Sequence, residues 1–269
     1  MMKKFFALLL TSIVTLSLVA CGTSSSSNNS EDKKVIKVGA TPVPHKEILE
    51  CIKDDLSEKG YELQIIEFSD YKVLNSALAD KEINANFFQH IPFLDEEVKN
   101  RGYDLDYTVK VHLEPLGLYS ATLKDFKDLK DGAKIAVPND PTNEARALRL
   151  LEENGLIKLN SGDLITVRDI TENPKNLSIS EIDAAQLPRT IQDVDAAVIN
   201  TNFAIQANFN PSKDALLLES KDSPYANILA VRKSDKDSPA IKTLSESLNS
   251  DKVTKFLEDK YNGSILPAF

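Results

Sequence analysis

The stretch "VPNDPTNEARAL", residues 137–148, holds the residues with the clearest potential for binding chemistry. Asp140 and Pro141 are typical of a helix start, because an acidic side chain caps the helix and proline fits its first turn. Arg146 follows near the positive end of the helix dipole, where a cation is disfavoured. A bound anion would offset that cost, since free backbone N–H groups and a guanidinium together hold a carboxylate or phosphate. The stretch therefore predicts an anion site at Arg146 and Asn143, with a solvated surface arginine as the alternative.

Other polar and aromatic side chains also follow short apolar runs. They are Tyr71 after residues 62–68, Phe88 and His90 of "FFQH" at the end of residues 83–88, and Asn200 after residues 194–199. If these runs are strands of open α/β sheets, ligands bind beyond their carboxyl ends, and the residues would share one site. Each also has an ordinary interpretation: the aromatic residues as core, the histidine as a loop residue, and the asparagine as the cap of the next helix.

The elements that would position these residues alternate between strand and helix. Apolar runs bounded by turn residues predict strands, and apolar residues at helical spacing predict helices. We expect strands at residues 35–40, 62–68, 83–88, 134–138, 177–182 and 194–199, and helices at 45–59, 71–79, 92–102, 141–155 and, as two short helices, 238–262. Such alternation is typical of an α/β fold with mostly parallel sheets.

Two long extended runs, residues 107–122 and 223–233, interrupt this alternation. The first is too long for one strand and contains Pro115 and Gly117, which interrupt strands. We interpret the runs as crossovers through which the chain leaves one lobe, builds a second and returns. The sequence thus predicts one lobe from residues 35–111 with 233–269, and a second lobe from residues 112–232.

The first 34 residues are not expected to belong to this fold. Two lysines and an apolar run precede Cys21, and the run is shorter than the roughly 20 apolar residues of a membrane span. Residues 1–20 therefore predict an export signal. The ending "LVAC" resembles the bacterial lipobox, after which cleavage leaves Cys21 to carry lipid. Residues 21–34 then form a flexible tether rich in serine and asparagine.

Charge and cysteine content narrow the possible functions. The formal net charge of −9 argues against a nucleic-acid partner, because phosphates favour basic proteins. The chain has two cysteines, so acylation of Cys21 would leave Cys51 without a disulfide partner. Cys51 lies at helical spacing with Ile48 and is expected to be a small core residue.

Seven stretches in order, from "VGATPVPHKEIL" through "NANFFQHIPFLDE", "VHLEPLGLYS", "VPNDPTNEARAL", "DITENPKNL" and "DAAVINTNFA" to "SPYANILAVR", resemble the NlpA lipoproteins, the methionine-binding lipoproteins of bacterial methionine ABC importers. The resemblance covers nearly all of residues 35–269. It implies a two-lobed, type II periplasmic-binding-protein fold, no catalysis and no cofactor. It also implies a lipid anchor on the outer face of the cell membrane and delivery of ligand to an ABC permease with its ATPase subunit.

The resemblance also implies roles for individual residues. Arg146, with Asn143 beside it, matches the family's carboxylate-binding arginine, and the amides Asn200 and Asn227 match those that hold the amino-acid backbone. The aromatic box around the thioether side chain corresponds to Tyr71, Phe88 and His90. One departure is Leu74, where the family usually has proline, which loosens the loop after Tyr71.

Other functions remain possible at this point. The ligand could be L-methionine, D-methionine, a methionine-containing dipeptide or another amino acid. A metal-binding lipoprotein would need His45, His90 and His112 to converge, but they lie in separate segments without ligand spacing, and no metal site is predicted. A hydrolase would need a nucleophile in a recognisable motif, and no GxSxG elbow is present.

Overall fold

A computed structural model describes residues 33–269 of the chain. The signal peptide, the lipidated Cys21 and nearly all of the tether were predicted for residues outside this range. The first described strand begins at Lys34, one residue earlier than predicted. No helix among the described residues has the length and apolar character needed to cross a membrane.

The first lobe is built on a six-stranded mixed sheet. Its strands, in spatial order, are β13 (Leu266–Pro267), β4 (Leu105–Leu113), β12 (Ala226–Arg232), β3 (Ala85–His90), β1 (Lys34–Ala40) and β2 (Tyr61–Glu67). Strand β1 runs parallel to β2 and β3, whereas β12 is antiparallel to both of its neighbours. The parallel pairs come from the predicted strand–helix alternation, and the antiparallel strands β4 and β12 come largely from the two extended runs.

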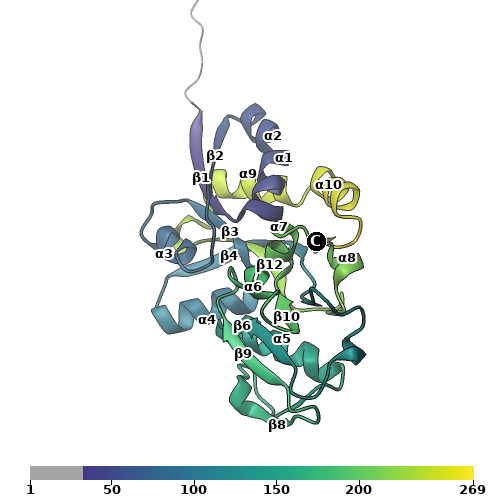
Figure 1. The fold of residues 1–269 in the computed structure, drawn as a ribbon. Coiled ribbons are helices and arrows are strands. Elements are labelled where there is room, and N and C mark those ends of the chain that lie inside the picture. The colour runs from purple at the N-terminus through teal and green to yellow at the C-terminus, as the bar shows by residue number, and fades with distance from the viewer. Residues whose placement is uncertain (1–32) are drawn as a thin grey trace, which may run out of the picture. The chain divides into compact units, whose positions relative to one another are not determined.

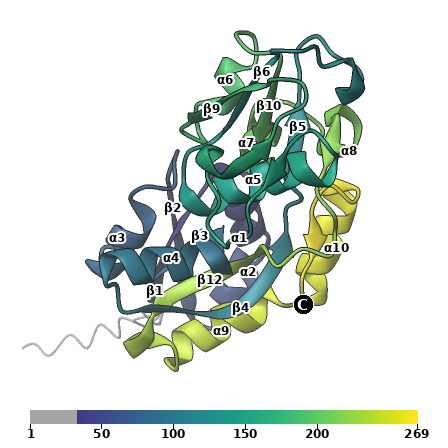
Figure 2. The ribbon, with the colours of Figure 1, turned by 90° about the horizontal axis from the view of Figure 1, so that it is seen from below.

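Helices cover both faces of this sheet (Figures 1 and 2). They are the π-turn η1 (Pro42–Lys46), α1 (Glu47–Cys51), α2 (Lys53–Glu58), α3 (Leu74–Ala79), α4 (Ile91–Arg101), the 3-10 turn η4 (Lys233–Asp235), α9 (Pro239–Leu248) and α10 (Asp251–Tyr261). Alternate side chains of β12 enter opposite layers, as the strand period of two requires. Leu229 and Val231 pack with α1, α2, α9 and α10, whereas Ile228 and Ala230 pack with α3 and α4.

The second lobe repeats this layered arrangement around a five-stranded sheet. Its strands are β11 (Leu217–Leu218), β5 (Gly117–Tyr119), β10 (Ala196–Ile199), β6 (Lys134–Pro138) and β9 (Ser178–Ile182), with a separate pair β7 (Lys158–Leu159) and β8 (Ile170–Glu172). Its helices are η2 (Phe126–Asp128), α5 (Pro141–Glu153), η3 (Val167–Asp169), α6 (Leu187–Thr190), α7 (Thr201–Gln206) and α8 (Pro211–Asp214). Val198 packs with α5, whereas Ala197 packs with α6 and α7.

The chain passes between the sheets twice, which confirms the predicted α/β fold with two lobes and two crossovers. The first passage joins β4 to β5 and the second joins β11 to β12. The predicted end of the second lobe at residue 232 is wrong, because β12 already pairs with β3 and β4 of the first sheet. Most of the extended run 223–233 has its ladder partners in the first lobe.

Two predicted helices also differ in detail. The helix predicted at residues 45–59 is three consecutive short segments that change conformation around Ile52. The helix predicted from Tyr71 begins only at Leu74, because the Asp70 side chain accepts a hydrogen bond from the backbone N–H of Lys72 and closes a turn. This turn places Tyr71 in a loop rather than on the helix.

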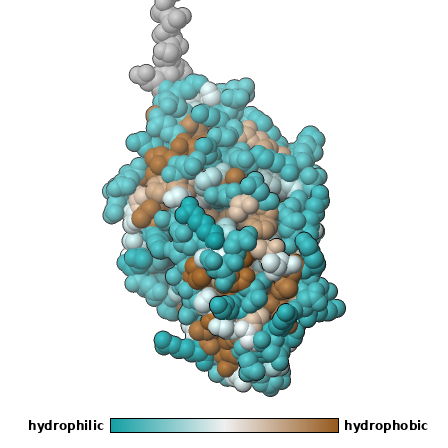
Figure 3. Space-filling model, viewed as in Figure 1, coloured by the Kyte–Doolittle hydropathy of each residue, from teal (hydrophilic) through white to brown (hydrophobic). Residues whose placement is uncertain are grey.

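On the face drawn in Figure 3, hydrophilic residues predominate and hydrophobic ones form separate patches.

Candidate functional site

All seven residues predicted for ligand binding line one cavity between the lobes. Its free space, including its opening, is about 330 Å³. The first lobe and the first crossover contribute Tyr71, Phe88, Gln89, His90, Phe93, Glu114 and Asn227, and the second lobe contributes Asn143, Arg146, Asn200, Thr201 and Asn202. The argument from strand ends is therefore confirmed for the position of the cavity.

The strand ends position these side chains directly. His90 is the last residue of β3 and caps α4, because its Nδ1 accepts from the backbone N–H of Phe93 at 3.2 Å. Asn200 follows the last residue of β10 and precedes α7. Asn200 occupies the N-cap position of α7, but its side chain makes no capping hydrogen bond and its Nδ2 donates to Asn143 instead.

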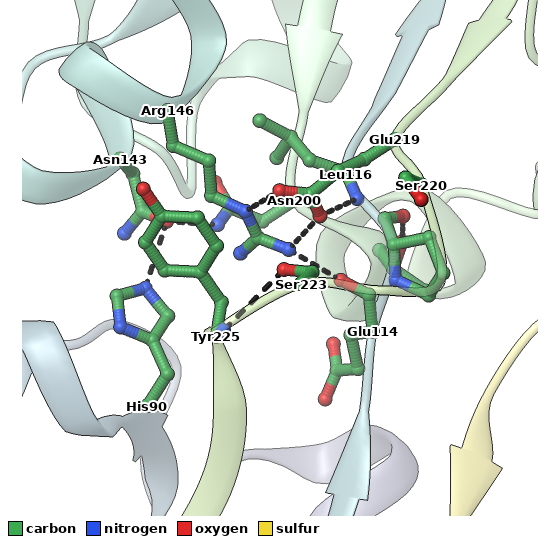
Figure 4. Close-up of polar contacts among 12 residues, drawn as sticks. His90, Glu114, Leu116, Asn143, Arg146, Asn200, Glu219, Ser220, Ser223 and Tyr225 are labelled. Atoms are coloured by element: carbon green, nitrogen blue, oxygen red, sulfur yellow. Dashed lines mark hydrogen bonds and ion pairs between the residues drawn. The ribbon is translucent and has the colours of Figure 1, made fainter. Parts of the chain in front are cut away.

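Arg146 is buried and already has an anionic partner in the protein. Its Nε donates to Glu219 Oε1 at 2.8 Å, and its Nη2 donates to Glu219 Oε2 and, at 2.7 Å, to the carbonyl oxygen of Glu114. The Tyr225 ring covers the guanidinium at 4.4 Å from its centroid (Figure 4). The surface alternative is thus wrong, and Glu219 occupies the Nε edge of the guanidinium. In the part of the chain described, Nη1 makes no hydrogen bond and remains for a ligand.

The start of α5 also carries its own anion. Asp140 Oδ1 accepts from the backbone N–H of Asn143 at 3.0 Å, so its carboxylate caps the helix. The amide group of Asn143 donates to the same carboxylate at 3.0 and 3.1 Å, while its Oδ1 accepts from Asn200 and His90. Both ends of the Asn143 amide are therefore used within the protein. Asn143 positions its neighbours and does not offer a free group to a ligand.

Two buried amide atoms in the cavity have no partner among residues 33–269. Asn200 donates through Nδ2 to Asn143 at 2.9 Å, which leaves its Oδ1 as an unpaired acceptor. Asn202 accepts through Oδ1 from the Tyr71 hydroxyl at 2.6 Å, which leaves its Nδ2 as an unpaired donor. Buried polar groups are almost always hydrogen-bonded, so such a pair indicates a ligand with one donor and one acceptor.

Sequence reasoning missed Asn202 and Glu114. Asn202 lies two residues after Asn200, and the repeated asparagine in "INTN" was an available signal. The Glu114 carboxylate accepts from His112 Nε2 at 2.7 Å and from the backbone N–H of Asn202 at 3.0 Å. Burial raises its pKa. The site therefore holds a buried acidic residue, Glu114, as well as the buried cation Arg146.

An aromatic wall adjoins these polar groups. Tyr71 lies 5.6 Å from Phe88, 6.0 Å from Phe93 and 4.9 Å from Phe203, measured between ring centroids. The predicted aromatic pair of Tyr71 and Phe88 therefore meets in the cavity. Burial, together with the charge of Arg146, lowers the pKa of His90 to about 3, so this ring is neutral.

A wider opening continues from the aromatic wall to the surface. Its free space, solvent included, is about 820 Å³, and it shares Tyr71 and Phe93 with the cavity. Lys72 from the first lobe forms an ion pair with Asp183 from the second at its margin. The opening and the polar cavity therefore meet at the aromatic wall.

Two of the three histidines meet Glu114 behind the cavity, although their sequence spacing gave no sign of it. Ligand atoms of His45, His112 and Glu114 lie within 4.8 Å of one another. The 2.7 Å between His112 Nε2 and Glu114 Oε1 is a hydrogen-bond distance, whereas two ligands of one tetrahedral zinc ion lie about 3.3 Å apart. The geometry therefore favours a hydrogen-bonded network over a metal site.

The two lobes and the buried polar cavity that both of them line define a substrate-binding protein of the two-lobed, periplasmic-binding-protein-like class. The chain belongs to the NlpA lipoprotein family, whose sequence profile matches residues 36–269. Members of this family are substrate-binding lipoproteins of transporters and not enzymes.

Named relatives and solved structures agree with this membership. The chain is 46% identical to the methionine-binding lipoprotein MetQ of Bacillus subtilis over 99% of both chains. It is 40% identical to the D-methionine-binding lipoprotein MetQ of Escherichia coli over 97% of this chain and 96% of the relative. The structure of a nutrient binding protein from Burkholderia cenocepacia bound to methionine is similar, with a TM-score of 0.85 and 49% identity, covering 87% of this chain and 100% of that one.

Proposed function

We propose that this protein captures methionine as a zwitterion in the cavity between its lobes and delivers it to an ABC permease. The observation that carries the proposal is the fixed set of opposite polar groups in the cavity. The names of the relatives, which bind methionine or D-methionine, support the choice of ligand.

The donors in the cavity suit the ligand carboxylate. They are Arg146 Nη1, Asn202 Nδ2 and the Asn227 amide, whose Oδ1 already accepts from His45. Hydrogen bonds from a guanidinium to a carboxylate are among the strongest in proteins. Because Glu219 occupies the Nε edge, the ligand would meet Arg146 from the Nη1 side.

The acceptors suit the ligand ammonium. Asn200 Oδ1 has no partner in the described chain, and the Glu114 carboxyl group lines the same cavity. A buried charge without a partner is costly, so the ligand ammonium would stabilise the buried Glu114 carboxylate by supplying a positive charge beside it. A bound ammonium would therefore lower the pKa that burial raises.

The aromatic wall suits the side chain. A thioether is polarizable and makes favourable contacts with aromatic rings, here Tyr71, Phe88 and Phe93. Because the ligand groups would contact both lobes, binding would favour the closed arrangement. The hydrogen bonds from Tyr71 to Asn202 and from His90 to Asn143 already join the lobes across the cavity.

The transport role includes the membrane. We propose that Cys21 carries lipid and holds the protein on the outer face of the cell membrane, where a permease driven by a cytoplasmic ATPase subunit receives the ligand. Replacement of Cys21 by alanine should release the protein from the membrane fraction. Retention of that variant would contradict the anchor.

Calorimetric titration tests the ligand assignment. L-methionine should bind, and analogues that lack either the carboxylate or the ammonium should bind at least about 100-fold more weakly, because each leaves buried charged groups unpaired. D-methionine and methionyl dipeptides, titrated in parallel, decide between the alternative ligands. Failure of every amino acid and dipeptide to bind would overturn the proposal.

A further inference from the structure

A chain of hydrogen bonds behind the cavity ends on a ligand-facing amide. Thr41 Oγ1 lies 2.7 Å from His45 Nδ1, and His45 Nε2 lies 3.0 Å from Asn227 Oδ1. Thr41 and His45 are at most 1% exposed, and Asn227 is 5% exposed and lines the cavity. Thr41 and His45 therefore lie outside the cavity, and the shortest polar contact of His45 with a cavity residue is the one to Asn227.

The chemistry of the three groups fixes the protons. Asn227 Oδ1 is only an acceptor, so the nitrogen of His45 that faces it must carry the proton. Burial, the largest influence, lowers the pKa of His45 to about 4, so the ring is neutral and carries a single proton. Nδ1 must then accept, and the Thr41 hydroxyl donates to it. The amide group of Asn227 is left to face the cavity as a donor.

The neighbours of His45 are consistent with this direction. Glu114 Oε1 lies 3.4 Å from His45 Nε2, which is longer than the bond to Asn227 and also calls for a proton on Nε2. His112 and Phe87 meet the ring edge-on at 4.9 and 4.7 Å. The other charged group of the site, Arg146, contacts Glu219 and Tyr225 rather than His45.

We propose that His45, held by Thr41 with its proton on Nε2, is a positioning residue that orients the Asn227 amide and thereby makes the site selective for a ligand carboxylate. This inference rests on the proposed function, because it assigns a cause to the carboxylate preference of that site. If His45 carried its proton on Nδ1, the Asn227 amide would turn over and present its carbonyl oxygen to the ligand.

Nitrogen NMR of the His45 ring tests the proton position without any ligand. Long-range proton–nitrogen spectra of the protein labelled in histidine should show Nε2 protonated and Nδ1 bare at pH 7.5. Assignment uses the loss of the signal in His45→Gln. A proton on Nδ1 would overturn the inference whatever the protein binds.

Binding selectivity tests the consequence. The affinity of L-methionine relative to methioninamide, in which a neutral amide replaces the carboxylate, should fall about ten-fold in His45→Phe, since one anchored donor is lost. His45→Gln, which keeps a donor at the position of Nε2, should restore the ratio. An equal loss for both ligands in His45→Phe would show a purely structural role and overturn the inference.

Phe87→Leu is the matched control. Phe87 is buried against the His45 ring but has no polar group, so this variant should lower the melting temperature and leave the affinity ratio unchanged. If the wild-type protein bound neither methionine nor its amide, the proposed function would fail, and the NMR experiment would still decide the orientation of His45.

Discussion

Replacement of Glu219 by glutamine tests how the Glu219 carboxylate and a ligand carboxylate share Arg146. In the structure, Glu219 accepts from Arg146 Nε at 2.8 Å and from Nη2, and its oxygen Oε2 also accepts from the backbone N–H of Leu116 at 3.2 Å. The side chains of Arg146 and Glu219 are 4% and 12% exposed, so the pair is mostly buried. Loss of one partner of such a pair leaves a buried charge without compensation.

We expect the ligand-free variant to lose about 3 kcal/mol of unfolding free energy, the lower part of the range for broken buried ion pairs. For a protein of this size that loss lowers the melting temperature by about 6–12 °C. Glu219 also repels a ligand carboxylate on the far side of the guanidinium, by roughly 2 kcal/mol at a separation of about 7 Å and an effective dielectric of about 20. Glu219→Gln should therefore bind methionine more tightly, by about 30-fold.

Differential scanning calorimetry with and without methionine, together with titration calorimetry, measures both effects. Glu172→Gln is the control, because its ion pair with Lys158 is exposed, with side chains 53% and 64% accessible. That variant should change neither quantity, as exposed pairs contribute little. An unchanged melting temperature, or weaker methionine binding in Glu219→Gln, would refute the reasoning and show that Glu219 mainly aligns Arg146.

Three further predictions follow from single groups. Tyr71→Phe removes the hydroxyl that donates a hydrogen bond to Asn202 across the lobes. Calorimetry should show methionine binding about 5–10-fold weaker, with an unfolding free energy near that of the wild type. An unchanged methionine affinity would contradict a bridging role for Tyr71. Burial lowers the folded-state pKa values of His45, His90 and His112 to about 4, 3 and 3, so below about pH 6.5 the unfolded chain binds more protons than the folded protein. Urea denaturation should therefore show stability falling below that pH, by at most roughly 2 kcal/mol per histidine at pH 5. Equal stability at pH 7.5 and pH 5 would exclude this effect for the three histidines. Glu144→Gln should stabilise the protein by about 1 kcal/mol more at pH 8 than at pH 5, since burial and then Glu181 raise the pKa of Glu144 to about 7. The unfolded chain loses this proton at a lower pH than the folded protein, so the cost to folding grows up to about pH 7 and then stays constant; the same gain at both pH values would exclude ionisation as the cause.

The position of the site could be predicted from sequence because strand ends are local features. Short apolar runs followed by Tyr71, His90, Arg146 and Asn200 were sufficient, since the carboxyl ends of parallel strands meet at one edge of a sheet. Asn227 was found only through the resemblance, because it lies on an antiparallel strand that returns from a crossover.

The partners of these residues could not be predicted. Glu219 lies 73 residues after Arg146, and the carbonyl group of Glu114 lies 32 residues before it. No periodicity links such pairs, because Glu114 and Glu219 lie at the starts of the two crossovers and only the tertiary path of these segments brings them to α5. The roles of Arg146 and Asn143 therefore changed once their partners were known, while their positions did not.

The same limit explains the misplaced lobe boundary. Residues 223–233 are extended and apolar in either lobe, and only their ladder with β3 and β4 assigns most of them to the first. Extended segments carry no local mark of the sheet they join.

A crystal structure of the protein with bound L-methionine is the most direct test of the proposed site. We predict that the ligand carboxylate lies within hydrogen-bond distance of Arg146 Nη1 and Asn227 Nδ2. The ammonium should contact Asn200 Oδ1 and the Glu114 carboxylate, and the sulfur should lie against Tyr71 and Phe88. A ligand bound outside this cavity, or one whose ammonium faces Arg146, would contradict it.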